Sequence, residues 1–145
     1  QRIKKFKFKP YETYISISKR GSVRGLHGQQ GKFSQSKIVF CIKGKILDLS
    51  IDLRKGSKTY GKIFKKILSA KNFSGILIPK GFVHGIIALE NKTMLINFSS
   101  SAYNPSKEFG VNINSLKLKL PKLRLIFSKK DKKLPNLKNI LRKNK

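Results

Sequence analysis

Apolar and polar residues alternate along most of the chain with a period of two, which is typical of half-buried β-strands. The alternation is clearest near the N-terminus, and shorter apolar runs continue it through the middle of the chain. Glycine, proline and asparagine separate the runs. The pattern predicts an all-β sandwich or barrel, with strands at 3–9, 11–18, 23–28, 38–42, 46–53, 62–68, 76–79, 82–89 and 93–98.

Residues 43–45 (K-G-K) predict a hairpin between the strands on either side. Residues 90–92 (E-N-K) turn the chain before the strand at 93–98. In the strand after the first turn, Asp48 and Asp52 stand four residues apart. Both carboxylates therefore point to one face of the sheet.

The C-terminal segment has a helical period instead. Pro135 stands near its start, lysines flank it, and its apolar residues recur at the spacing of one helical face. These residues are Leu134, Leu137, Ile140 and Leu141. They predict a short C-terminal helix on the outside of the barrel.

Length and cysteine content indicate a single domain. A chain of 145 residues fits one domain spanning 1–145. The lone Cys41 excludes an internal disulfide, and its apolar neighbours predict a buried, inert thiol. No apolar run is long enough to span a membrane, and no signal-like apolar stretch follows the basic N-terminus. We therefore expect a cytoplasmic protein with no membrane partner.

The chain is strongly basic, with 34 Lys and Arg against 6 Asp and Glu and a formal net charge of +28. Such an excess favours polyanions, nucleic acids among them. The lysines, however, are spread along the whole chain, and no RNP1-like aromatic motif is present. Nucleic-acid binding is therefore the weaker interpretation, and most of the charge is expected to lie on a solvated surface.

A compact polar group occupies 22–37, where Arg24, His27 and Lys37 stand close together. In a regular strand Arg24 and His27 point to opposite faces, unless the neighbouring glycines bend it. Two interpretations are open at this point: a solvated edge strand with an incidental histidine, or a reactive site.

Several motifs follow one another in a characteristic order. They are V-R-G-L-H at 23–27, Q-S-K at 35–37, I-L-D-L-S-I-D-L-R-K-G-S at 46–57, T-Y-G at 59–61, L-S-A-K-N at 68–72, I-P-K-G-F-V-H-G at 78–85, Y-N-P at 103–105 and S-K-K-D at 128–131. In order and spacing the chain resembles the nucleotide-sugar 3,5-epimerase family (dTDP-4-dehydrorhamnose 3,5-epimerase-like) of the cupin superfamily. The resemblance implies a cupin-like double-stranded β-helix (jelly roll).

The resemblance also implies the chemistry. It assigns His27 as the base that removes a proton beside a 4-keto group, and Asp131 as the carboxylate that orients this histidine. Lys37 falls where an ammonium stabilises the enolate, and Arg24 falls on the substrate's phosphate side. His84 matches a substrate-contact histidine. Two plainer readings stay open, a surface ion pair for Asp131 and a satisfied core histidine for His84.

The remaining assignments include departures from the family pattern. Gln29 and Tyr103 match substrate-binding positions, whereas Asn97 falls where the family carries its proton-donating tyrosine. An amide cannot deliver a proton as a phenol does, and Tyr103 is a substitute only by hypothesis. Gly28 stands at a position that is aromatic in the family, and from the sequence we expect no counterpart to the longer N-terminal β segment that reaches a neighbouring subunit in the family.

The resemblance implies an epimerase of a dTDP-linked or similar nucleotide-diphosphate 4-keto-6-deoxy sugar, acting at C3, C5 or both, in deoxysugar and surface-polysaccharide biosynthesis. No cofactor or metal is expected, because the chain has no His-x-His and only two histidines. A homodimer is expected. A single-centre epimerase and a non-catalytic relative that binds a nucleotide sugar are the alternatives.

Overall fold

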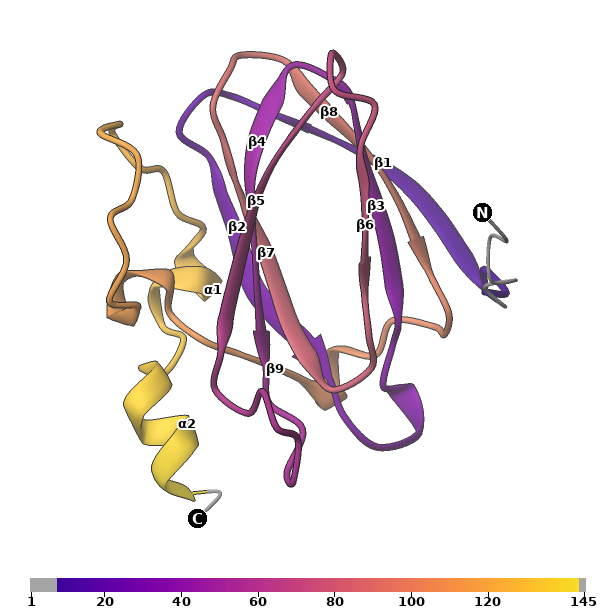
Figure 1. Ribbon diagram of the computed structural model, residues 1–145, viewed down its shortest axis with the longest axis vertical. Helices are drawn as coiled ribbons and strands as arrows, with labels where there is room; N and C mark the ends of the chain where they lie inside the picture. Colours follow the sequence, from indigo (N-terminus) through magenta and orange to yellow (C-terminus); the bar gives the residue numbers. More distant parts are fainter. Residues whose placement is uncertain (1–7, 144–145) are drawn as a thin grey trace.

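The computed structural model describes residues 8–143, and within them nine strands form two antiparallel sheets (Figure 1). The eight strands predicted from 11–18 onward are present, each within one residue of its expected ends. The short β9 was not predicted, and the strand expected at 3–9 lies largely outside the described residues. The strands are β1 (Glu12–Ser18), β2 (Val23–Gln29), β3 (Lys37–Lys43), β4 (Lys45–Asp52), β5 (Ile63–Ser69), β6 (Gly75–Ile78), β7 (Phe82–Ala88), β8 (Thr93–Ser99) and β9 (Glu108–Gly110).

The strand order is that of a jelly roll. One sheet has the order β1-β8-β3-β6, and the other has the order β5-β4-β7-β2-β9. The predicted hairpin at 43–45 is wrong in its pairing, because β3 lies in the first sheet whereas β4 lies in the second. The turn at 90–92 likewise leads from β7 in the second sheet to β8 in the first. The short connections carry the chain from one sheet to the other. Sequence periodicity marks where a strand lies and not which strand it pairs with, so it could not distinguish the two arrangements.

Two apolar cores hold the sheets in place. Alternation along β4 serves both, because Ile46 packs between the sheets whereas Leu47, Leu49 and Ile51 pack on the outer face of the five-stranded sheet. The inner core includes the buried Cys41, the pKa of whose thiol is raised by burial. Asp48 and Asp52 share the face of Ile46, as predicted, and both are fully buried.

The C-terminal third of the chain covers the five-stranded sheet (Figure 1). Leu116, Leu125, Phe127 and Ile140 pack there with the outer core. The predicted C-terminal helix is α2 (Leu137–Lys143), and a four-residue helix α1 (Lys129–Lys132) precedes it. Short 3-10 turns lie at η1 (Gly31–Phe33), η2 (Pro105–Lys107) and η3 (Ile113–Ser115). Of the helices between residues 8 and 143, none is long and apolar enough to cross a membrane.

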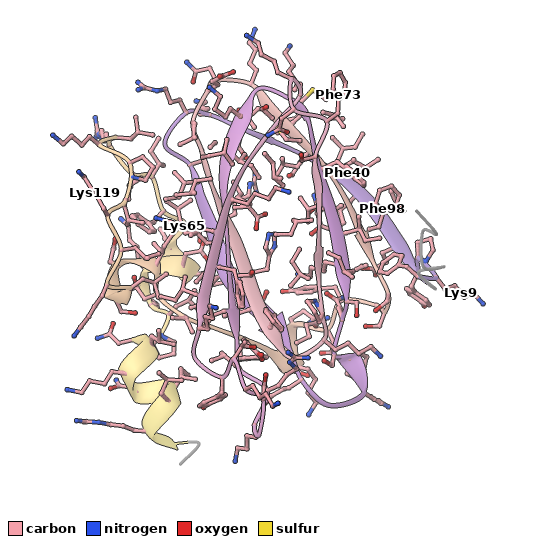
Figure 2. All side chains as sticks on the ribbon, viewed as in Figure 1. Lys9, Phe40, Lys65, Phe73, Phe98 and Lys119 are labelled. Carbon is pink, nitrogen blue, oxygen red and sulfur yellow. The ribbon has the colours of Figure 1, made fainter. Side chains whose placement is uncertain are left out.

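The outer face of the four-stranded sheet has no such cover among the described residues. Ile15, Ile17, Phe40 and Leu77 on this face are each exposed by 38% or more. In the register, Phe98 lies beside Ile38, and Figure 2 shows Phe40 and Phe98 on the outside of the sheet. A wide apolar surface is thus left open on the side away from α1 and α2.

Candidate active site

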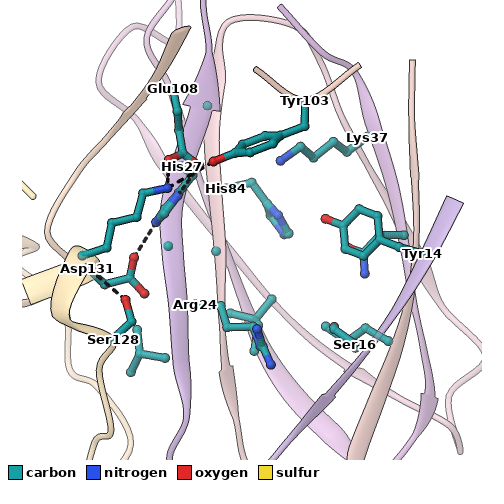
Figure 3. A pocket seen from close by; sticks show the side chains of 18 of the residues that line it. Tyr14, Ser16, Arg24, His27, Lys37, His84, Tyr103, Glu108, Ser128 and Asp131 are labelled. Carbon is teal, nitrogen blue, oxygen red and sulfur yellow. Dashed lines mark hydrogen bonds and ion pairs between the residues drawn. The ribbon is translucent and has the colours of Figure 1, made fainter. Parts of the chain in front are cut away.

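A cavity of about 750 Å³ lies between the two sheets, within the range of small-molecule sites. Tyr14, Lys37 and Asn97 line it from the four-stranded sheet, and Arg24, His27, His84 and Glu108 from the five-stranded sheet. Asp131 and Lys130 of α1 also line it, and Figure 3 shows Asp131 at one side of the cavity. Every residue assigned to the site from the sequence lines this cavity.

Arg24 and His27 both face the cavity because β2 is bent between them. The β2–β7 register shifts between these two residues. Gly25 lies in the shift with φ +102°, and a Cβ there would stand 2.6 Å from the carbonyl oxygen of His84. Only glycine fits this backbone. The edge-strand reading is also wrong, because β2 lies between β7 and β9.

Carboxylates engage both ring nitrogens of His27. Nε2 lies 2.5 Å from Asp131 Oδ1, and Nδ1 lies 2.7 Å from Glu108 Oε1. Asp131 is only 6% exposed, so the surface-ion-pair reading of this residue is wrong. Its backbone N–H donates to Ser128 Oγ at 3.0 Å, which caps α1 and fixes the carboxylate. The His27–Asp131 contact expected from the sequence is thus present.

Glu108 and Lys130 are site residues that the sequence did not reveal. Lys130 forms an ion pair with Glu108 and donates to the Tyr103 hydroxyl at 3.3 Å. Burial disfavours the ionised form of Glu108, but the hydrogen bonds from Lys130 and His27 outweigh it and lower the pKa of the carboxyl. Glu108 lies in a three-residue strand with no periodic pattern. Glu108 pairs with Gln29, two residues from His27, and this pairing is known only once the strand topology is known.

Lys37 is a half-buried cation on the opposite wall. Burial lowers the pKa of its ammonium, and the negative charge of Glu108 partly opposes this change. No carboxylate among the residues described forms an ion pair with it. An ammonium without a counter-ion in such a place is suited to meet a negative charge that develops on a ligand.

His84 and Asp48 form a second buried pair, with Nε2 2.7 Å from Asp48 Oδ2. His84 is 9% exposed and still lines the cavity. It is therefore both a satisfied core histidine and a cavity residue. Asp48 Oδ1 is buried with no hydrogen-bond partner among the described residues, so the pair retains one free acceptor.

The other assigned residues have diverse contacts. Arg24 is held on β1, since Nη2 donates to the carbonyl oxygen of Ile17 at 2.9 Å and Nε to Ser18 Oγ at 3.0 Å. The Gln29 amide bonds to backbone instead, accepting from Asn104 N at 2.6 Å and donating to the Ala102 oxygen at 3.1 Å. Gln29 thus holds the 102–104 loop at the cavity rim.

Asn97 is 6% exposed and lines the cavity. It lies between Tyr14 on β1 and Val39 on β3 in the register of the sheet. At Gly28, a Cβ would meet the Phe82 carbonyl oxygen at 2.7 Å and the Phe109 ring at 3.0 Å. Phe109 therefore fills the space beside Gly28, so that no aromatic side chain could stand there.

No group of three His, Cys, Asp or Glu side chains suited to a metal ion occurs within residues 8–143. The site is built instead from imidazole, carboxylate and ammonium groups. Such a set can remove a proton beside a carbonyl and stabilise the resulting charge.

Residues 1–139 match the family model of dTDP-4-dehydrorhamnose 3,5-epimerase. The chain belongs to this family. The dTDP-4-dehydrorhamnose 3,5-epimerase of Escherichia coli K12 is 34% identical over 130 residues, which cover 88% of this chain and 70% of the relative. The chain spans only 65% and 51% of the length of two further curated relatives.

Solved structures of the family superpose closely on the fold. The dTDP-4-dehydrorhamnose 3,5-epimerase of Elizabethkingia anophelis has a TM-score of 0.85 at 36% identity, covering 90% of this chain and 74% of its own. A 3'-monoepimerase from Streptomyces bikiniensis in complex with dTDP-quinovose has a TM-score of 0.85 at 26% identity, covering 92% and 69%. The cupin-like jelly roll expected from the sequence is confirmed.

Proposed function

We propose that this member of the family epimerises a dTDP-linked 4-keto-6-deoxy sugar at C3, C5 or both, in deoxysugar and surface-polysaccharide biosynthesis. The observation that carries the proposal is the His27–Asp131 pair on one wall of the cavity, facing the ammonium of Lys37, which forms no ion pair with the described residues, on the other. The relatives named above act on sugars of this class, and the cavity is large enough for a nucleotide sugar's hexose.

The first half of the reaction follows from these groups. His27 removes the acidic proton next to the ketone, and the electron pair passes into an enolate. Lys37 stabilises the enolate oxygen, since an ammonium in a poorly solvated cavity interacts more strongly with a developing charge than it would in water. Asp131 keeps the ring oriented and balances the imidazolium that forms.

One carboxylate must leave the imidazole before it can accept a proton from a sugar, because both nitrogens are engaged. Glu108 has a second partner in Lys130, whereas Asp131 is fixed by the Ser128 cap. Glu108 is therefore the side that yields to substrate, and Asp131 is the permanent partner. Lys130 then balances the negative charge of Glu108 without His27.

Cations at the cavity favour a diphosphate. Arg24 lies on the cavity wall with its guanidinium tethered to β1, and the basic surface raises the local concentration of anions. His84, Asn97, Gln29 and Tyr103 line the same space and are proposed to contact the sugar, or in the case of Gln29 to hold the rim that does. Arg24 is proposed to bind phosphate.

The experiment is hydrogen exchange on dTDP-4-dehydrorhamnose in D2O, followed by NMR at C3 and C5. Deuterium at both carbons supports 3,5-epimerisation, and deuterium at one carbon supports the single-centre alternative that the Streptomyces bikiniensis relative represents. Binding without exchange at either carbon would reject catalysis and favour the non-catalytic relative.

We further propose that the chain forms a homodimer through the open face of the four-stranded sheet. Monomeric proteins seldom expose contiguous apolar surfaces as wide as the one that includes Ile15, Ile17 and Phe40. Sedimentation at several concentrations tests this. The cytoplasmic location remains a prediction, and the nucleic-acid reading remains the weaker alternative.

A further inference from the structure

Inversion of a carbon needs a proton donor on the side opposite the base. Asn97 stands where the family resemblance places the donor, and its amide cannot fill that role. Two phenols line the cavity among the residues described, those of Tyr14 and Tyr103. The question is which of them faces His27 across a bound sugar.

Tyr14 lies on the wall opposite His27. It is the cross-strand partner of Asn97 in the β1–β8 pair, so the two side chains are neighbours on one face of the four-stranded sheet. Lys37 lies on that same face. It is the cross-strand partner of Ser99, which is two residues along β8 from Asn97. The cation and the phenol thus share the wall that faces the base.

The Tyr14 hydroxyl points into the cavity toward His84 (Figure 3). It has no hydrogen-bond partner within residues 8–143, and the residue is 48% exposed although its ring lines the cavity. Burial, and then the negative charge of Glu12, raise the pKa of this phenol, and Arg24 partly opposes them. The hydroxyl therefore keeps its proton at neutral pH and is free to donate it to a ligand.

Tyr103 is placed differently. Its hydroxyl accepts a hydrogen bond from Lys130 at 3.3 Å, and Lys130 is paired with Glu108, which contacts His27. Tyr103 thus belongs to the network around the base, as Figure 3 also shows. A donor on the same side as the base would return the proton without inversion.

We propose that Tyr14 is the acid that returns the proton from the face opposite His27, in place of the tyrosine that Asn97 has replaced. The inference rests on the proposed function. Tyr14 on β1 would then supply the proton donor that is absent at Asn97 on the neighbouring strand β8.

The proton balance is closed by water. The C–H bond breaks, its proton passes to the His27 ring and its electron pair enters the enolate. The enolate carbon then takes the Tyr14 hydroxyl proton on its other face, which forms the new C–H bond and leaves a phenolate. Water reprotonates the phenolate, and the imidazolium releases its proton to water.

The test separates exchange from inversion. In D2O, Tyr14→Phe is expected to retain deuterium incorporation into dTDP-4-dehydrorhamnose within about tenfold of wild type, because His27 is 19% exposed and can exchange its proton with solvent. Formation of the epimer is expected to fall about 100-fold or more, the usual contribution of a general acid. Tyr11→Phe is the control, because Tyr11 is 69% exposed and lies outside the cavity lining.

Two further variants make the test decisive. In Tyr14→Phe/Asn97→Tyr the phenol stands one strand away on the same wall, and inversion is expected to return. A double variant as inactive as Tyr14→Phe would overturn the proposal, as would loss of inversion in Tyr103→Phe with normal inversion in Tyr14→Phe. Wild-type protein that shows no exchange at all would reject the proposed function itself.

Discussion

Replacing Asp131 by asparagine tests the base most cleanly, because the substitution keeps the shape of the side chain and removes its charge. Asp131 Oδ1 lies 2.5 Å from His27 Nε2 and is almost wholly shielded from solvent. The variant loses both the orientation of the ring and the balancing charge for the imidazolium. The fold is expected to survive, since Ser128 accepts from the backbone of residue 131 and not from its side chain.

The size of the effect follows from the contact. A hydrogen bond to a charged group in a protein contributes about 1.5–3 kcal/mol. Each 1.36 kcal/mol of lost transition-state stabilisation corresponds to a tenfold change in rate. Asp131→Asn should therefore lower the exchange rate about 10- to 150-fold, with a small change in dTDP affinity because no phosphate contact is involved.

The assay is deuterium incorporation by NMR, with a urea unfolding curve to show that the variant is folded. Glu90→Gln is the matched carboxylate-to-amide control, since Glu90 forms only a solvent-exposed ion pair with Lys45 at 3.5 Å and such pairs contribute little. A folded Asp131→Asn variant whose rate stays within threefold of wild type would refute the role given to this carboxylate.

Three other predictions concern different parts of the molecule. Lys37→Met should lower the exchange rate about 100-fold or more, yet leave the urea midpoint equal or higher, because the half-buried ammonium is costly to desolvate. Asp52→Asn should destabilise the fold by about 1.5–3 kcal/mol at pH 7, the contribution of hydrogen bonds to a charged group, since buried Asp52 accepts from Arg54 Nη2 at 2.7 Å and from two hydroxyls. Hydrogen bonds hold the pKa of Asp52 well below its ordinary value, so its contribution to the free energy of unfolding is present above about pH 4 and shrinks as the pH falls. Urea unfolding curves of wild type and Asp52→Asn at pH 7 and pH 3 measure this difference. Phe40→Glu should convert the proposed dimer to a monomer in sedimentation, and an unchanged dimer would place the interface elsewhere.

Much of the fold follows from local pattern. Alternation placed eight of the strands after residue 11 to within a residue, although it missed the three-residue β9. Alternation carries no information about which sheet a strand joins, and for this reason the sequence predicts a hairpin at 43–45 where the chain crosses between the sheets. The two cores and the cavity between the sheets form because the chain passes from one sheet to the other at this turn and at the one at 90–92.

The site was predictable where a residue carries a distinctive motif and unpredictable where only topology places it. His27, Lys37 and Asp131 belong to motifs that run in family order. Glu108 reaches His27 through β9, a strand of three residues, and Tyr14 reaches the cavity through its register with Asn97. No local pattern in the sequence marks either contact.

The central claim is that His27 removes the proton from a bound nucleotide sugar. The most direct measurement is the exchange rate of dTDP-4-dehydrorhamnose in D2O with His27→Ala, alongside wild type and with dTDP binding measured for both. The account predicts rapid exchange by wild type, a loss of about 1000-fold or more in the variant as expected for a missing general base, and nearly equal dTDP affinity. Equal exchange by His27→Ala and wild type would contradict it.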